Sequence, residues 1–142
     1  MATDPHDLER FRSAQDAHHA HDDALAELRS GRKTTHWMWF VFPQIAGLGR
    51  SSTAIHFAIR SLEEARAYLA DPVLGPRLRE ASEAAASAPA RSAEQLLGDI
   101  DAVKLRSSMT LFAHAAPEVA VFRRVLDRWF GGVEDDGTLA RI

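Results

Sequence analysis

The segment 36–44 constrains the fold more than any other part of the chain, because it concentrates aromatic side chains in the order His-Trp-Met-Trp-Phe-Val-Phe-Pro-Gln. It holds two of the three Trp residues and two of the seven Phe residues. Aromatic side chains bury the largest areas of any residue type, so we expect this segment at the centre of the core. The polar residues within the segment and just after it are then held in fixed positions, as a binding site requires. They are His36, Gln44, Arg50 and Ser51.

Helical patterns surround this segment, and their capping and stop residues mark the expected helices. These lie at about 7–29, 61–70, 72–87, a short helix after 92, 101–115, 117–130 and a last turn after 136. Residues 36–42 have a strand-like pattern, but no second strand is available to pair with them, so we expect a short helix or an irregular buried segment there. The predicted fold is all-α, a compact single-domain bundle of about six or seven helices with a buried aromatic segment, over residues 1–142.

Composition excludes several classes of protein. A length of 142 residues suits one domain, and 46% hydrophobic with 26% charged residues is ordinary globular usage. The net charge of -3 argues against a surface built as a whole for nucleic acid, and the absence of Cys excludes disulfides, thiolate metal sites and cysteine nucleophiles. Residues 1–7 are polar, and no apolar run approaches the roughly 20 residues of a membrane span. We therefore expect a cytoplasmic protein with no secretory signal and no membrane partner.

An ordered series of short motifs runs through nearly the whole chain. It includes Arg10-Phe11, Ala14-Gln15, His36-Trp37-Met38-Trp39-Phe40, Phe42-Pro43-Gln44, Gly47-Leu48-Gly49 and Ser107-Ser108-Met109-Thr110-Leu111-Phe112. By these motifs the chain resembles a family of small bacterial proteins carried as a domain of unknown function, some of them mislabelled calpastatin. The resemblance implies a mainly helical single domain and a bacterial cytosolic setting, and it implies no particular activity. The chain departs from the family pattern in its first helix, at His18, His19, His21, Asp22 and Asp23.

A first candidate site is an anion site beside the aromatic segment. Basic residues precede the segment at Arg29, Arg32 and Lys33, and the glycine-rich turn 47–52 precedes the apparently helical residues 53–59. Glycines let backbone amides point into a concavity, and a helix N-terminus adds about half a positive charge. Phosphate or carboxylate would be favoured there, with Gly49, Arg50 and Ser51 as contacts. The alternative is a plain turn with a Ser cap beside a solvated basic loop.

A second candidate lies on the helix expected from Asp101. Its buried stripe consists of Leu105, Met109 and Phe112. Its other side carries Arg106, Ser107, Thr110 and His114. Lys104 and Ser108 fall inside the apolar arc, and a Lys in a first helical turn opposes the helix dipole. A desolvated Lys has a lowered pKa and can act as a base, with the neighbouring Ser as a nucleophile. Alternatively, Lys104 reaches water or pairs with a carboxylate, and Ser108 bonds back to a carbonyl.

Histidines and paired carboxylates also have two interpretations. His36 could transfer protons, or could be a core-edge residue bonded to a carbonyl. His18 and His21 share a helix face, but no third ligand has diagnostic spacing, so no metal site is expected. Adjacent carboxylates could hold Mg²⁺, but in a Gly-rich tail they are more typical of a turn and a helix cap; these are Asp135 and Asp136.

The leading hypothesis is a domain that binds a small anionic, phosphorylated or nucleotide-like ligand, with enzymatic activity left open and no cofactor expected. The candidate catalytic residues are His36, Lys104 and Ser108. The candidate ligand contacts are Arg10, Gln15, Trp37, Trp39, Gln44, Gly49, Arg50 and Ser51. An alternative is a protein interaction module without activity, and a weaker one is binding of RNA or single-stranded nucleic acid through the basic loop and the Trp pair. The ligand's identity and the oligomeric state stay open.

Overall fold

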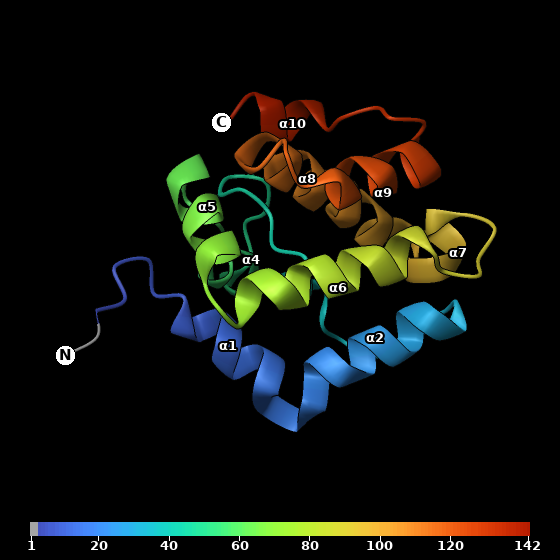
Figure 1. Cartoon of the computed structure of the whole chain (residues 1–142), viewed down its shortest axis with the longest axis horizontal. Coiled ribbons are helices and arrows are strands. Elements are labelled where there is room, and N and C mark those ends of the chain that lie inside the picture. Colours follow the sequence, from blue (N-terminus) through green and yellow to red (C-terminus); the bar gives the residue numbers. More distant parts are fainter. Residues whose placement is uncertain (1–2) are drawn as a thin grey trace.

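Ten α-helices and one 3₁₀ turn follow one another along residues 3–142, the part of the chain that the computed structural model describes (Figure 1). The six longer helices are α1 (Glu9–Asp16), α2 (Ala20–Ser30), α5 (Leu62–Ala70), α6 (Leu74–Ala86), α8 (Asp99–Ala115) and α9 (Ala120–Phe130). The short elements are η1 (Ala17–His19), α3 (Met38–Val41), α4 (Ser52–His56), α7 (Ala93–Leu97) and α10 (Asp136–Leu139). The all-α prediction is confirmed. The first two residues of the polar N-terminal segment, Met1 and Ala2, lie outside the described residues.

Helix α8 is the central element of the packing. It contacts α5, α7, α9 and α10, while α6 packs against both α2 and α9. Figure 1 shows α1 and α2 meeting in a sharp bend, with α6 crossing the middle of the molecule above them. Within residues 3–142, no helix combines the length and the apolar character that crossing a bilayer requires.

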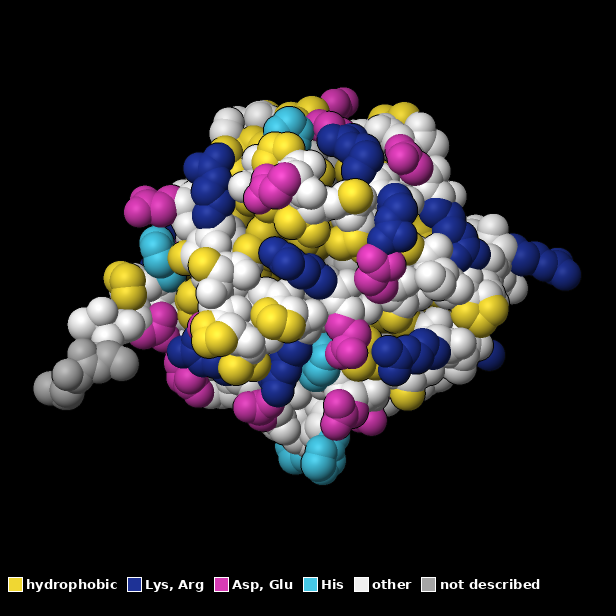
Figure 2. All heavy atoms as spheres, in the orientation of Figure 1, with side chains coloured by type: hydrophobic (Ala, Val, Ile, Leu, Met, Phe, Trp, Pro, Cys, Tyr) yellow, Lys and Arg dark blue, Asp and Glu magenta, His cyan; other side chains and the backbone are white. Residues whose placement is uncertain are grey.

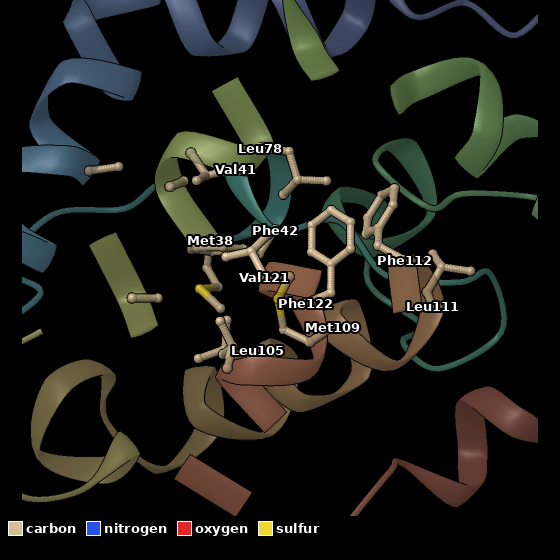
Figure 3. Close-up of a cluster of buried hydrophobic side chains, with 14 of the residues drawn as sticks. Met38, Val41, Phe42, Leu78, Leu105, Met109, Leu111, Phe112, Val121 and Phe122 are labelled. Atoms are coloured by element: carbon tan, nitrogen blue, oxygen red, sulfur yellow. The ribbon is translucent and has the colours of Figure 1, made fainter. Parts of the chain in front are cut away.

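The aromatic segment forms the short helix α3 and lies in the core, as expected. Met38, Val41 and Phe42 are each at most 2% exposed, and Figure 3 shows their side chains among those of α8 and α9, such as Met109 and Phe122. Burial of a large apolar side chain contributes about 1.5–3 kcal/mol, so this cluster is a main source of stability. Ile45, just after α3, forms an isolated parallel bridge with Ile59, which fixes the path of the chain beyond the helix.

Most of the expected caps are present. The hydroxyls of Ser51, Ser61 and Ser92 each accept a hydrogen bond from the backbone N–H three residues later, at 3.0–3.1 Å. Asp135 caps α10 in the same way, which confirms the turn-and-cap interpretation of this carboxylate. Gly31 ends α2 at φ +88°, where a Cβ would lie 2.6 Å from the carbonyl oxygen of Pro89.

Three expected helix starts are shifted. Asp4, not Asp7, caps the first helix, because its carboxylate accepts from the backbone N–H groups of residues 8 and 9. Asp71 accepts from the N–H groups of residues 73 and 74, so the next helix begins at 74 and not at 72. Helix α9 begins at 120 instead of 117.

Two expected helices are interrupted or shortened. The single helix predicted over 7–29 is two helices, because His18 and His19 adopt left-handed φ values of 53° and 56° and bend the chain. The left-handed region is costly for residues with a Cβ, so helical periodicity alone does not reveal it. The helix expected over 53–59 ends at His56, and the residues after it run to the bridge at Ile59.

Candidate functional site

The entry into the aromatic segment is fixed by one carboxylate. Glu27, on α2, accepts hydrogen bonds from the N–H groups of Thr34 and Thr35, the Thr35 hydroxyl and Nε1 of Trp37, at 2.5–3.1 Å. Burial opposes ionisation of this group, but the hydrogen bonds from Thr35, Thr34 and Trp37 outweigh it and lower the pKa of Glu27 to about 2. Trp37 is 1% exposed and is therefore mainly a core residue, and the little surface that it keeps lines a concavity beside His36.

Trp39, two residues later, has a different environment. It is partly exposed, and the Lys104 Nζ lies 3.9 Å from the centroid of its ring. The same Nζ is 3.1 Å from one carboxylate oxygen of Asp101, whose other oxygen lies 3.0 Å from the Nζ of Lys33. Lys33 in turn lies over the ring of Trp37, at 5.2 Å. One carboxylate therefore bridges two ammonium groups, each of which covers one Trp.

Helix α8 begins two residues earlier than expected, at Asp99, which changes the interpretation of Lys104. Lys104 lies in the second turn and pairs with Asp101 three residues before it, the carboxylate alternative left open by the sequence. The predicted polar side of this helix is also wrong in part, because Ser107 and Thr110 are buried. Their hydroxyls bond back to the carbonyls of Val103 and Arg106.

A groove with a volume of about 500 Å³ opens beside Lys104. Its apolar walls come from Trp39 and Leu48 on one side and from Ile100 and Val103 of α8 on the other. The polar lining consists of Gln44, Lys104, Ser107 and Asp135. Ligand sites are typically concave, mostly apolar and furnished with a few convergent polar groups, and this groove has that composition. We call it the α8 groove.

A smaller hollow of about 180 Å³ adjoins the α8 groove, and Trp39, Gln44 and Gly49 line both. Its other walls include Ala46, Phe57 and Arg60. A Cβ at Gly49 would lie 2.7 Å from the Cβ of Ala54, so only glycine allows the chain this close to α4 at the border of the two spaces. We call this space the Arg60 hollow.

Two predicted ligand contacts lie in the interior instead. Arg10 is buried; it donates to Glu64 at 2.9 Å and to four backbone oxygens, those of His6, Asp7, His56 and Ala58. The spacing of Ser61 and Glu64 is that of a capping box, but it is only half formed: the Ser61 hydroxyl accepts from the Glu64 N–H, while the Glu64 carboxylate binds Arg10. Gln15 donates from Nε2 to the carbonyl of Phe40 at 2.8 Å and to the Tyr68 hydroxyl at 3.0 Å. Both side chains join distant segments, so their role here is structural.

The remaining predicted residues do not meet in one hollow. His36 is exposed and lines a separate concavity between the α1–α2 bend and α3. Arg50 is exposed and lines neither the α8 groove nor the Arg60 hollow, and Ser51 serves as the cap of α4. Ser108 is fully buried, and its hydroxyl has no hydrogen-bond partner within residues 3–142, so it does not bond back to a carbonyl. Lys104, Trp39, Gln44 and Gly49 come together at the α8 groove, whereas His36 and Trp37 share the separate concavity.

The histidines of the first helices are separated by the bend. His18 is exposed, whereas His21 is buried with its Nε2 at 3.3 Å from a Glu80 carboxylate oxygen. Burial lowers the pKa of His21. Among the described residues, no three His, Asp or Glu side chains lie close enough together to hold a metal ion.

The family described as Protein of unknown function (DUF1810) matches residues 5–142. The chain belongs to this family. Among solved structures, this DUF1810 chain is similar to the crystal structure of the conserved hypothetical protein Rv1873 from Mycobacterium tuberculosis. The two share 48% sequence identity over 96% of each chain, with a TM-score of 0.92. No curated protein matches the chain. The predicted resemblance to a mainly helical family is confirmed.

Sequence reasoning missed several residues of the two spaces in this DUF1810 chain. Arg60 follows the expected helix 53–59 and has no motif around it, yet the Ile45–Ile59 bridge brings it beside Gln44. Leu48, Ile100 and Val103 also line the α8 groove, and a hydrophobic residue carries no local sign of being exposed. For Ile100 and Val103 the one exception is their position on the helix, because both fall outside the stripe of Leu105, Met109 and Phe112 and so could have been expected at the surface.

Proposed function

We propose that the α8 groove binds a small ligand with a flat or apolar body and an overall negative charge, in the class of nucleotides and phosphorylated metabolites. The observation that carries this proposal is the Lys104 ammonium, held 3.9 Å from the Trp39 ring centroid between apolar walls. Flat apolar groups pack well on an indole face, and a fixed ammonium gives such a site a preferred charge.

The charges beside Trp39 favour a negatively charged group at that point of the groove. Asp101 is a single carboxylate between Lys33 and Lys104, whose side chains are only 9% and 17% exposed. This trio therefore keeps one net positive charge beside Trp39, while Asp135, which also lines the groove, carries a negative charge that balances it over the groove as a whole. Interactions between charges are stronger in this partly desolvated place than in water, which favours an anion beside Trp39.

The proposal is one of binding, and it also places the protein in the bacterial cytoplasm. The bacterial relative and the absence of Cys support this setting. His36 lies at a separate concavity, so it does not provide a proton-transfer group next to Lys104. The nucleic-acid alternative loses one of its two stacking residues, because Trp37 is buried. On the face drawn in Figure 2, basic and acidic side chains are also interspersed and do not form a continuous basic surface.

Thermal-shift and calorimetric titrations of the full chain with adenosine 5′-monophosphate, uridine 5′-monophosphate and ribose 5-phosphate test the proposal. We expect at least one of them to raise Tm and to give a measurable Kd. Lys104→Ala and Trp39→Ala should each raise that Kd about tenfold, as losing a contact worth about 1.4 kcal/mol would do. His36→Ala is the matched control and should bind like wild type. Absence of a shift with all three compounds, or an equal loss in the control, contradicts the proposal.

A second candidate function rests on two exposed apolar side chains. Ile100 is 74% exposed and Val103 is 60% exposed, and both line the α8 groove. Exposed apolar patches often mark protein interfaces, so the groove could instead receive an apolar segment of a partner protein. In that case, partner binding should fall in Val103→Ser and persist in Lys104→Gln, whereas the small-ligand proposal expects both variants to lose affinity for the phosphates.

A further inference from the structure

Trp39 stands as a shared wall between the α8 groove and the Arg60 hollow, together with Gln44 and Gly49. A ligand that lies against Trp39 in the larger space is therefore next to the smaller one. The volumes differ, at about 500 and about 180 Å³, so the two spaces suit a larger body and a smaller group.

The charged residues of the two spaces also differ. In the α8 groove, Lys104 is accompanied by Asp135 in the lining and is paired with Asp101. In the Arg60 hollow, Arg60 is the one charged side chain among the residues that line it. Arg60 is exposed, and within residues 3–142 no carboxylate forms an ion pair with it. The small hollow is thus the place where an anionic group meets a guanidinium without displacing an existing ion pair.

From these observations, and resting on the proposed function, we propose that the ligand spans Trp39. Its flat body lies in the α8 groove, and its phosphate or carboxylate lies in the Arg60 hollow, bound by Arg60. A guanidinium offers planar, paired donors that match the oxygens of phosphate and carboxylate. Lys104 then faces the polar edge of the body, and its charge favours the ligand at longer range. Arg60 becomes the residue that determines specificity for an anionic group.

Gly49 has a defined part in this arrangement. A Cβ there would meet Ala54 at 2.7 Å and the far edge of the Trp39 ring at 3.9 Å. The glycine thus lets the chain pack closely against Ala54 where the two spaces adjoin.

The test compares each phosphate with its own dephosphorylated counterpart: adenosine 5′-monophosphate with adenosine, uridine 5′-monophosphate with uridine, and ribose 5-phosphate with ribose. For the pair that binds best, we expect the phosphate to bind wild type at least about tenfold more tightly, as one charge-assisted contact provides. In Arg60→Gln, this ratio should fall to about threefold or less while the Kd of the neutral compound stays unchanged. Arg60→Lys, which keeps the charge, should retain part of the ratio.

Arg50→Gln is the matched control, because Arg50 is an exposed arginine in the same region that lines neither space. It should keep the wild-type ratio. An equal loss in Arg50→Gln would show a general effect of surface charge and overturn the assignment of Arg60. If Arg60→Gln keeps the wild-type ratio while Lys104→Ala abolishes it, the spanning arrangement is wrong and the proposed function stands. If no compound binds, both are wrong.

Discussion

Trp37 and Trp39 are two residues apart, and each has a lysine over its ring, yet they serve different parts of the molecule. Trp37 is buried and donates to Glu27, which also holds the backbone of the preceding residues. Trp39 is partly exposed and forms a wall of both the α8 groove and the Arg60 hollow. Trp37 thus anchors the aromatic segment in the core, whereas Trp39 forms part of the surface.

The difference follows from where the two residues lie: Trp37 is the N-cap that precedes α3, whereas Trp39 lies inside this helix. Residues two apart around a helix point to nearly opposite sides, since each residue adds about 100°. When Trp37 points toward α2 and the core, Trp39 therefore points away from it. The anchored residue fixes the position of the exposed one, and this arrangement gives the groove a rigid wall.

The largest expected effect concerns the buried member of the pair. Trp37→Ala removes a fully buried indole and leaves Glu27 without one donor, so the free energy of unfolding should fall by about 3–5 kcal/mol. Trp39→Ala, at a partly exposed position, should lower it by less than about 1.5 kcal/mol. Urea denaturation of both variants measures the difference. Equal losses in the two variants would contradict the division into anchor and surface.

The next effect depends on pH and concerns the anchor. The pKa of Glu27 is about 2, below its ordinary value of 4.5, so its contribution to stability is complete above pH 4.5 and is lost as pH falls toward 2. Between pH 5 and pH 2 this loss should be roughly 1–2 kcal/mol, less than the whole shift implies because solvent screens the partly exposed carboxylate.

Glu27→Gln should lack this loss, because an amide does not titrate in that range. Its free energy of unfolding, compared with that of wild type from pH 5 to pH 2, should decrease less steeply. Glu94→Gln, at an exposed glutamate on α7, is the control and should follow the wild-type curve. A wild-type slope in Glu27→Gln would show that the hydrogen bonds to Glu27 do not hold the aromatic segment.

The comparison also shows which parts of the fold the sequence predicts. Helix caps and stops are local. A serine hydroxyl accepts from an N–H three residues later, so a sequence pattern finds the caps at Ser51, Ser61 and Ser92. Gly31 tolerates the positive φ just after the helix that the sequence predicts to end at about residue 29. The bend at His18 and His19 is not local, because residues with a Cβ adopt left-handed φ values only where tertiary packing compensates the cost. Helical periodicity continues through such a bend.

The candidate site is predicted in part, for a similar reason. The sequence identifies the aromatic segment and Lys104 correctly as neighbours, because both carry unusual residue types for their positions. It does not distinguish Trp37 from Trp39, since both occupy one motif. The glycine-rich turn points to Arg50 as the anion contact. In the structure, Arg60 lines the hollow instead, because the bridge between residues 45 and 59 places it there. The two residues of this bridge are 14 positions apart in the sequence, and a local sequence pattern does not reveal such a contact.

A smaller effect concerns the contact between Trp39 and Lys104. A double-mutant cycle with Trp39→Leu, Lys104→Met and the combination should give a coupling energy of about 0.5–1 kcal/mol, typical of a cation–π contact near the surface. Adding salt should reduce this value little, because ions screen a contact at 3.9 Å weakly. A coupling energy near zero would mean that Asp101 alone holds Lys104 and that the ammonium gains nothing from the Trp39 ring.

The smallest effect on stability concerns the opposite wall of the α8 groove. Ile100→Ser and Val103→Ser change side chains that are mostly exposed, so each should alter the free energy of unfolding by less than about 0.5 kcal/mol. The same substitutions remove apolar surface from the groove and should weaken ligand binding several-fold, because about 25 cal/mol is lost for each Å² of apolar contact that disappears. Urea denaturation and calorimetric titration of the same samples separate the two quantities. A variant that loses stability and binding together would place these residues with Trp37 in the core, whereas loss of binding alone places them with Trp39 as part of a surface shaped for another molecule.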